Sequence, residues 1–278
     1  MTIRLNESNY FSTEADSTYL SASQIKRFLE CEAMALAEIR GEYKREETAA
    51  LLVGGYVDAY FSRSLDVWVS QHPQILTQKG TLRAEFQQAQ EIIAYIENDP
   101  LLMAMSRGDL QVISTGEING FPFKCKVDVL LDEAQCKAIT QDFPEMAEHL
   151  LMAPGAIVDW KIMRDMEPAF VPGAGRVSFI QAWRYDLQMA IYQRRIGSNY
   201  PCFLLVATKE KVPDKALIHI PQYMLDAAWA SVEEQLPRFQ HLKSHPGEAI
   251  ACGKCEWCRQ VKKLTGAIEA DELEGALL

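Results

Sequence analysis

The chain has 278 residues, of which 48% are hydrophobic and 24% are charged, and its formal net charge is −10 at pH 7. This is ordinary globular composition, and the acidic balance argues against a protein that coats nucleic acid nonspecifically through a basic surface. No apolar run reaches the roughly 18 residues of a membrane span, and the polar segment 1–10 lacks the apolar core of a secretory signal. We therefore expect a cytosolic protein in which the seven cysteines are thiols or metal ligands rather than disulfides.

Helical patterns fill the first third of the chain. Ser21 is placed to cap the first helix, Gln24 completes the pattern of a capping box, and apolar residues continue at helical spacing to Ala37. Two further helices are predicted at about 46–64 and 82–98. A pair of glycines lies inside the first of these two, which indicates close packing or the close approach of a ligand.

A β region follows these helices. Strands are predicted at 111–117 and 121–131, joined by the turn-forming dipeptide Asn119-Gly120, and a third strand is predicted at 156–161. The remaining segments are predicted to be irregular loops at 132–155 and 164–178, long helices at 179–195 and 224–242, and strands at 201–208 and 217–220.

The order of these elements predicts a fold of the α/β or α+β class. We expect a central mixed β-sheet flanked by helices, with a crossover helix between two of its strands and helical additions at both ends. The whole chain, 1–278, is interpreted as one domain. Its approximate parts are an N-terminal helical part at 19–110, the sheet and crossover helix at 111–220, a C-terminal helix with a cysteine motif at 221–263, and an acidic tail at 264–278.

Two of the predicted strands each carry one acid among apolar residues. Asp128 lies within the run 126–131, and Asp159 lies within the run 156–161. A carboxylate in a buried strand is unfavourable without a partner, and oxygen ligands on neighbouring strands suit Mg²⁺. Lys161 shares a strand face with Asp159, because side chains alternate, and its ammonium group can position water or stabilise a phosphate. This combination predicts metal-assisted phosphodiester hydrolysis; the alternative is that each acid only begins a turn.

The helix predicted after the second of these strands carries two polar groups on one face. Gln188 and Tyr192 are four residues apart, so their amide and phenol groups can both reach a phosphate or a base edge near the metal. The alternative is that Tyr192 is a core aromatic residue and Gln188 is solvated. Among the basic residues, Lys126 is the best candidate for a DNA contact, because it alternates with Asp128 on one strand face.

Three cysteines form a Cys-x-x-Cys-x-x-Cys motif near the C-terminal end of the chain, at Cys252, Cys255 and Cys258. Thiolates at this spacing indicate a metal centre, since each of them can reach the same ion or cluster. Such a centre needs a fourth ligand from elsewhere in the chain. The cysteines at 125, 136 and 202 are interpreted as ordinary thiols.

An acid on one strand, Asp-x-Lys on the next and Gln-x-x-x-Tyr on the following helix resemble the PD-(D/E)XK nuclease superfamily. The resemblance is greatest to RecE-like and phage-encoded exonucleases, with the nuclease domains of AddB-type helicase–nucleases as relatives, and it extends over about residues 20–263. It implies a core like that of restriction endonucleases. Residue by residue, it implies Asp128 and Asp159 as metal ligands, Lys161 as the catalytic lysine, and Gln188 and Tyr192 as further catalytic-site residues.

The same resemblance implies two additional ligands. Relatives carry a Gly-x-x-x-His motif on an N-terminal helix, and Asp58 stands at the histidine position here, so it is implied as a third oxygen ligand for Mg²⁺ or Mn²⁺. Cys31 stands where AddB-type nucleases carry the lone N-terminal cysteine of an iron–sulfur cluster. With the C-terminal motif it implies a 4Fe–4S site, with zinc or an empty reduced site as alternatives. Glu117 is a weaker candidate for orienting a group of the active site.

The resemblance implies a function in DNA processing. We expect a magnesium-dependent exonuclease, encoded by a phage or prophage, that resects the ends of linear double-stranded DNA in the 5′→3′ direction. The family also implies a single-strand annealing protein as partner, and a homo-oligomer is a further expectation. The alternatives are a catalytically inactive nuclease-like module that binds DNA or protein, and a structure-specific endonuclease.

Overall fold

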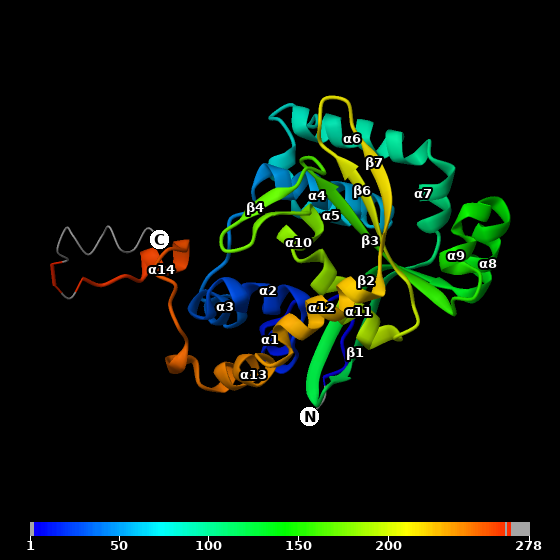
Figure 1. The fold of residues 1–278 in the computed structure, drawn as a ribbon. Coiled ribbons are helices and arrows are strands. Elements are labelled where there is room, and N and C mark those ends of the chain that lie inside the picture. The colour runs from blue at the N-terminus through cyan, green and yellow to red at the C-terminus, as the bar shows by residue number, and fades with distance from the viewer. Residues whose placement is uncertain (1–2, 265, 268–278) are drawn as a thin grey trace.

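The computed structural model describes residues 3–264, 266 and 267, and a five-stranded mixed sheet lies at its centre (Figure 1). The strands lie in the order β1 (Asp109–Ile118), β2 (Phe121–Asp132), β3 (Gly155–Met163), β6 (Cys202–Thr208) and β7 (Lys215–Ile220). β3 and β6 pair in parallel, and the other neighbours in this sheet pair antiparallel. The predicted central mixed sheet is therefore confirmed, with β7 beginning two residues earlier than expected.

The hairpin of β1 and β2 closes at the predicted dipeptide. Ile118 pairs with Phe121, so Asn119 and Gly120 alone form the turn. Their φ angles of 52° and 79° place both residues in the left-handed region that a type I′ turn requires. This turn sets the register of β2, the strand that carries Asp128.

Helices cover both faces of the sheet (Figure 1). Along β6, the side chains of Leu204 and Val206 face one core, and those of Phe203 and Leu205 face the other. Every residue of β6 is buried, as expected for a strand covered on both sides. The first core contains residues of α2 (Ala22–Glu30), α11 (Tyr185–Ile196) and α12 (Gln222–Glu233), and the second contains residues of α4 (Ala49–Phe61), α6 (Ala84–Glu97) and α8 (Glu133–Asp142).

Shorter elements complete the described fold. The remaining α-helices are α1 (Thr13–Thr18), α3 (Glu32–Ile39), α5 (Leu65–Gln71), α7 (Pro100–Met105), α9 (Ala147–Leu150), α10 (Phe179–Ala182), α13 (Leu236–Ser244) and α14 (Glu256–Gln260). The short 3-10 turns are η1 (Pro73–Ile75), η2 (Pro144–Met146) and η3 (Pro246–Glu248), and a separate hairpin consists of β4 (Ala169–Val171) and β5 (Gly175–Val177).

The first predicted helix differs from the structure in its length and its cap. Cys31 adopts an extended backbone, with φ −168° and ψ 114°, so α2 and α3 are separate helices. Ser21 accepts from the Gln24 backbone N–H at 3.3 Å, as predicted. The Gln24 side chain instead donates to the main-chain and carboxylate oxygens of Asp16, each at 3.0 Å. The predicted capping box is therefore only half formed, because Asp16 takes the amide.

The prediction of an irregular loop at 132–155 is wrong, because this segment contains α8, η2 and α9. Asp132 and Gln135 form a complete capping box: the Gln135 backbone N–H donates to Asp132 at 2.7 Å, and the Asp132 N–H donates back at 2.9 Å. α8 buries only Cys136, Ile139 and Thr140. This small apolar face produces a weak helical period, and the capping residues were the available signal.

Both long helices predicted in the second half of the chain are interrupted. Arg184 has a left-handed backbone with φ 53°, and it separates α10 from α11. α13 begins after α12 at Leu236, with proline in its first turn, where the missing N–H has no intrahelical partner to lose. Helical periodicity continues across both breaks in the sequence, so the apolar pattern alone does not reveal them.

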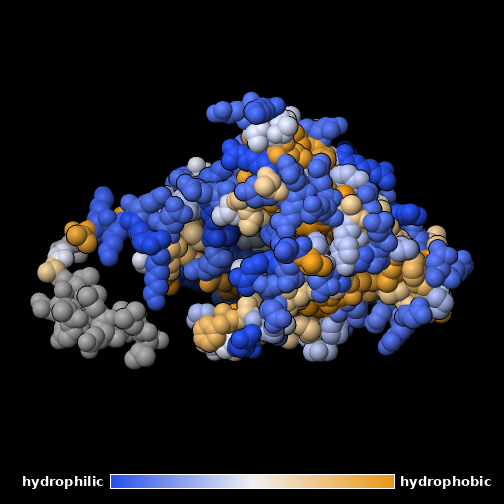
Figure 2. Space-filling model, turned by 90° about the horizontal axis from the view of Figure 1, so that it is seen from above, coloured by the Kyte–Doolittle hydropathy of each residue, from blue (hydrophilic) through white to orange (hydrophobic). Residues whose placement is uncertain are grey.

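The surface and the ends of the chain add little to the fold. Seen from the top of Figure 1, the surface is largely hydrophilic with smaller hydrophobic patches (Figure 2). Within the part of the chain that the structure describes, no helix is long and apolar enough to cross a membrane. The predicted acidic tail at 264–278 lies almost entirely outside the described residues.

Candidate active site

The two strand acids lie where β2 and β3 separate. The antiparallel pairing of these strands reaches Val129 and Val158, and Asp128 and Asp159 are the next residue on each strand. The Asp128 carboxylate accepts a hydrogen bond from the backbone N–H of Trp160 at 3.0 Å. The Asp128 side chain thus accepts from a β3 backbone N–H just beyond the last paired residues of the two strands. Both carboxylates therefore lie where β2 and β3 diverge, which we call the fork of the sheet.

Asp159 forms polar contacts with two other residues at this fork. One of its oxygens forms an ion pair with Lys161, and the other accepts from the Gln188 side-chain amide at 2.7 Å. The same amide lies 3.2 Å from the Tyr192 hydroxyl, because α11 places Gln188 and Tyr192 one turn apart. The structure therefore brings these four predicted residues together, and the alternative of a solvated Gln188 does not hold.

Two residues of the site were missed by sequence reasoning. Lys26 of α2 donates to the Gln188 side-chain carbonyl at 3.2 Å. The Tyr185 ring lies between two ammonium groups, 5.1 Å from Lys26 and 4.9 Å from Lys161. Tyr185 shares the face of Gln188 and Tyr192 and could have been found from that spacing. No local pattern links Lys26 to a residue 162 positions away.

The acids at the fork repel one another in the absence of a bound cation. Burial, with repulsion from Asp159 and Asp58, raises the pKa of Asp128 well above its ordinary value. Burial and repulsion from Asp159 also raise the pKa of Asp58. Although burial lowers the pKa of Lys161, attraction from Asp159 and Asp128 outweighs it, so the pKa rises and the lysine stays charged.

A cavity of about 710 Å³ opens over this fork, and Asp58 of α4 lines it together with Asp128, Asp159 and Lys161. Gly54 and Gly55 of the same helix also line it, and a Cβ added at Gly55 would lie 3.1 Å from the Trp68 ring, so the prediction of close packing holds at Gly55 but not at Gly54. The carboxylate oxygens suit Mg²⁺ or Mn²⁺. Among the described residues, however, the three acids do not bring one oxygen each to within 4.8 Å of one another. The three acids thus line one cavity without forming a compact set of ligands in this structure.

Of the two remaining predicted residues, Lys126 lies near the site and Glu117 does not. Lys126 lines a second cavity of about 240 Å³ that Asp128 and Gln188 also line, so it lies close to the candidate site. Its ammonium group lies 5.4 Å from the ring centroid of Phe11. Glu117 is exposed near the end of β1 and lines neither cavity, so the structure does not bring it to the fork.

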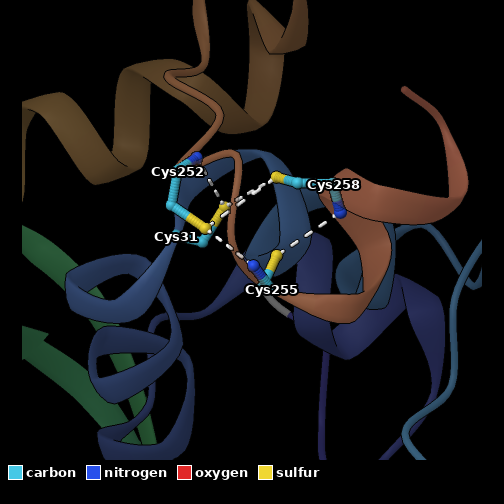
Figure 3. A group of neighbouring side chains, drawn as sticks. All are labelled: Cys31, Cys252, Cys255 and Cys258. Carbon is cyan, nitrogen blue, oxygen red and sulfur yellow. Dashed lines mark hydrogen bonds between the residues drawn. The ribbon is translucent and has the colours of Figure 1, made fainter. Parts of the chain in front are cut away.

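The four cysteines that the sequence singles out also come together (Figure 3), and none of them lines the cavity over the fork. Cys31 lies at the break between α2 and α3, whereas the other three belong to the C-terminal segment that ends in α14. Each sulfur lies within 4.8 Å of every other. The cysteine site is thus distinct from the cavity that contains the acids and Lys161.

A mixed sheet that carries an acid on one strand, Asp-x-Lys on the next and a crossover helix against both defines a PD-(D/E)XK-like nuclease fold. The chain belongs to the family described as "PDDEXK-like domain of unknown function (DUF3799)", whose model matches residues 21–139 and 148–261. The crystal structure of a candidate exonuclease from Eubacterium rectale is 35% identical, with 98% of each chain covered and a TM-score of 0.86. No curated protein matches the chain.

Proposed function

We propose that this protein is a divalent-metal-dependent DNA exonuclease. The observation that carries the proposal is the convergence of Asp128, Asp159, Lys161 and Gln188 on one side of an open cavity. These groups combine anionic metal ligands, a charged lysine and a neutral donor, which is the set that phosphodiester hydrolysis requires. The family and the solved neighbour support a nuclease as the class of activity.

Each side chain then has a distinct part in the reaction. Asp128 and Asp159 would hold Mg²⁺ or Mn²⁺, with Asp58 as a third carboxylate, and the bound ion would lower the pKa of a water molecule and polarise the phosphate. Lys161 retains its charge and positions the attacking water or stabilises charge on the phosphate oxygens. Gln188 holds the Asp159 carboxylate in place through its amide.

The DNA end is held by groups on both sides of the fork. Tyr192 and Lys26 reach the fork through Gln188, and Lys126 faces it from the second cavity. A local set of basic groups can bind phosphate although the chain has a net charge of −10. The resemblance to phage-type exonucleases supports 5′→3′ resection of linear duplex DNA, a single-strand annealing protein as partner, and assembly into a homo-oligomer.

The proposal is tested with duplex DNA labelled at either the 5′ or the 3′ end. The purified protein is incubated with Mg²⁺ or with EDTA beside Lys161→Ala. Lys137→Ala is a matched control, because Lys137 is an exposed lysine that pairs with Glu133 on α8. We expect magnesium-dependent release of mononucleotides by the wild type and by Lys137→Ala, and loss of at least about 100-fold in Lys161→Ala, the scale seen when one electrostatic stabiliser is removed.

The other outcomes point to the alternatives. Cleavage of closed circular DNA at the rate of linear DNA would indicate an endonuclease rather than an exonuclease. End binding without cleavage, with any divalent metal, would indicate a catalytically inactive DNA-binding module. Activity that survives in Lys161→Ala would contradict the assignment of this lysine.

A further inference from the structure

The sulfur atoms of the cysteine site are close enough to share one ion. The Cys31 and Cys258 sulfurs are 3.6 Å apart, the Cys252 and Cys258 sulfurs are 4.0 Å apart, and each pair in the set of four lies within 4.8 Å (Figure 3). Four thiolates bound to one ion at about 2.3 Å occupy the corners of a tetrahedron whose edges are about 3.8 Å. The first two separations lie on either side of that edge, and no pair is more than about 1 Å longer than it.

A cubane iron–sulfur cluster requires a wider arrangement. Its four thiolates bind four different irons, which sit at separate corners of the cluster, and each thiolate points outward from its own iron. The thiolate sulfurs are then farther apart than on a single ion by at least the spacing between irons. The compact set seen here does not fit the 4Fe–4S occupant that the resemblance implies. We propose that Cys31, Cys252, Cys255 and Cys258 bind a single tetrahedral Zn²⁺ ion.

The backbone around the site favours thiolate ligands. Cys252 accepts from the backbone N–H groups of Lys254 and Cys255, at 3.4 and 3.2 Å. Cys255 accepts from the N–H of Cys258 at 3.4 Å, and Cys31 accepts from the N–H of Cys252 at 3.4 Å. Donors directed at sulfur stabilise the negative charge that metal ligands carry. These contacts orient the ligand sulfurs.

Contacts outside the four ligands hold the two halves of the site together. Glu32 forms a two-pronged ion pair with Arg238 and accepts from the Ile250 backbone N–H at 2.8 Å. The Tyr43 hydroxyl donates to Glu256 at 2.7 Å. These polar contacts bring the C-terminal segment against α3, next to Cys31. The ion would fasten this junction.

The zinc site is structural. Four protein thiolates fill the coordination of zinc and leave no position for water or substrate, which is the arrangement of structural rather than catalytic zinc. The apolar cluster at this junction is small, with Cys31, Met34 and Cys258 as its buried members. The free energy of metal binding therefore contributes a large part of what holds the C-terminal segment in place.

The test uses the full chain, purified without oxygen from cells supplied with both iron and zinc. Metal content is measured by elemental analysis, and inorganic sulfide is measured after acid release. We expect about one zinc per chain, no inorganic sulfide and no visible absorption in the wild type. Cys136→Ala, at a buried cysteine outside the site, is the matched control and should keep its zinc. Cys258→Ser should lose it.

Iron together with inorganic sulfide in the anaerobic protein would overturn the proposal. Because Cys258→Ser is at risk of not folding, the wild type is also stripped with a chelator and titrated with Co²⁺, which absorbs visible light strongly in a tetrahedral thiolate site. Saturation at one equivalent, reversed by Zn²⁺, is the expected result. Failure to take up either ion, with uptake of iron and sulfide instead or of nothing, would also overturn it.

Discussion

The Gln188 side-chain amide donates to the Asp159 carboxylate at 2.7 Å, and this bond joins α11 to β3 at the centre of the candidate active site. The second Asp159 oxygen is held by Lys161, so both oxygens of this buried acid have a partner. The Gln188 carbonyl in turn accepts from Lys26 at 3.2 Å. One neutral side chain therefore connects an acid and a base from distant parts of the chain.

Gln188→Ala should lower nuclease activity by about 10- to 100-fold, the usual loss when a group that orients a metal ligand is removed. The Asp159 carboxylate would keep only its ion pair with Lys161, and Lys26 would lose its acceptor. Gln87→Ala, at an exposed glutamine of α6, should keep full activity. Rates are measured on linear duplex DNA at saturating Mg²⁺. Equal rates for the two variants would show that Gln188 does not orient the acid.

Asp128→Asn should stabilise the metal-free protein at neutral pH. The pKa of Asp128 in the folded protein is raised, chiefly by burial, so the folded state holds its proton more tightly than the unfolded state. The free energy of unfolding of the wild type in EDTA should therefore fall as the pH rises from 3.8 through the raised pKa. Asparagine carries no charge, so the variant should lack this contribution.

Melting curves in EDTA across this pH range measure the effect. We expect the Tm of Asp128→Asn to exceed that of the wild type by about 2–4 °C at pH 7.5, as about 1 kcal/mol gives in a domain of this size, and the difference to shrink as the pH falls. A difference that does not depend on pH would mean that charge burial is not its cause.

Magnesium should stabilise the wild type and should do so more strongly at higher pH. The cation attracts the carboxylates that repel one another without it, and protons compete with it for the same oxygens. At about 100 times its Kd, a ligand adds about 2.7 kcal/mol to the free energy of unfolding, which is a rise in Tm of roughly 5–10 °C. Asp159→Ala should show almost none of this rise, and an equal rise in that variant would place the ion elsewhere.

Lys124→Ala should destabilise the protein strongly. This lysine is 1% exposed, and its ammonium group pairs with Asp16 at 2.7 Å and donates to the Tyr10 carbonyl. Its removal leaves Asp16 without its cation, and we expect a loss of about 2–4 kcal/mol, since Asp16 keeps partial contact with water. The matched variant is Lys126→Ala, two residues along the same strand, which should change stability by about 0.5 kcal/mol or less. Urea unfolding of both proteins decides whether burial of the ion pair matters.

Local sequence patterns predict the strands and much of the site. The apolar runs around Asp128 and Asp159 identify the strands, the dipeptide Asn119-Gly120 identifies the hairpin, and the spacing of Gln188 and Tyr192 places both on one helix face. Each of these inferences depends on residues within about four positions of one another. Backbone geometry relates such residues directly, whatever the rest of the chain does.

Other features of the fold interrupt helical patterns that look continuous in the sequence. The extended backbone of Cys31, the left-handed Arg184 and the diversion of Gln24 to Asp16 each interrupt a pattern that reads as continuous helix. α8 was missed although its capping residues, Asp132 and Gln135, were visible in the sequence. At Cys31, Arg184 and Gln24, contacts with other parts of the fold outweigh helix propensities of less than about 1 kcal/mol per residue, whereas α8 is encoded locally by its cap.

The amino-acid sequence by itself identified the candidate residues for the chemistry: two strand acids, a lysine two positions after the second, and a Cys-x-x-Cys-x-x-Cys motif. Only the tertiary structure decided that Lys26 contacts Gln188, that Asp58 lines the same cavity as the two strand acids, and that the four sulfurs lie within 4.8 Å of one another. Distances between residues far apart in the chain depend on how whole helices pack against a sheet. No periodicity of side chains within one segment encodes them.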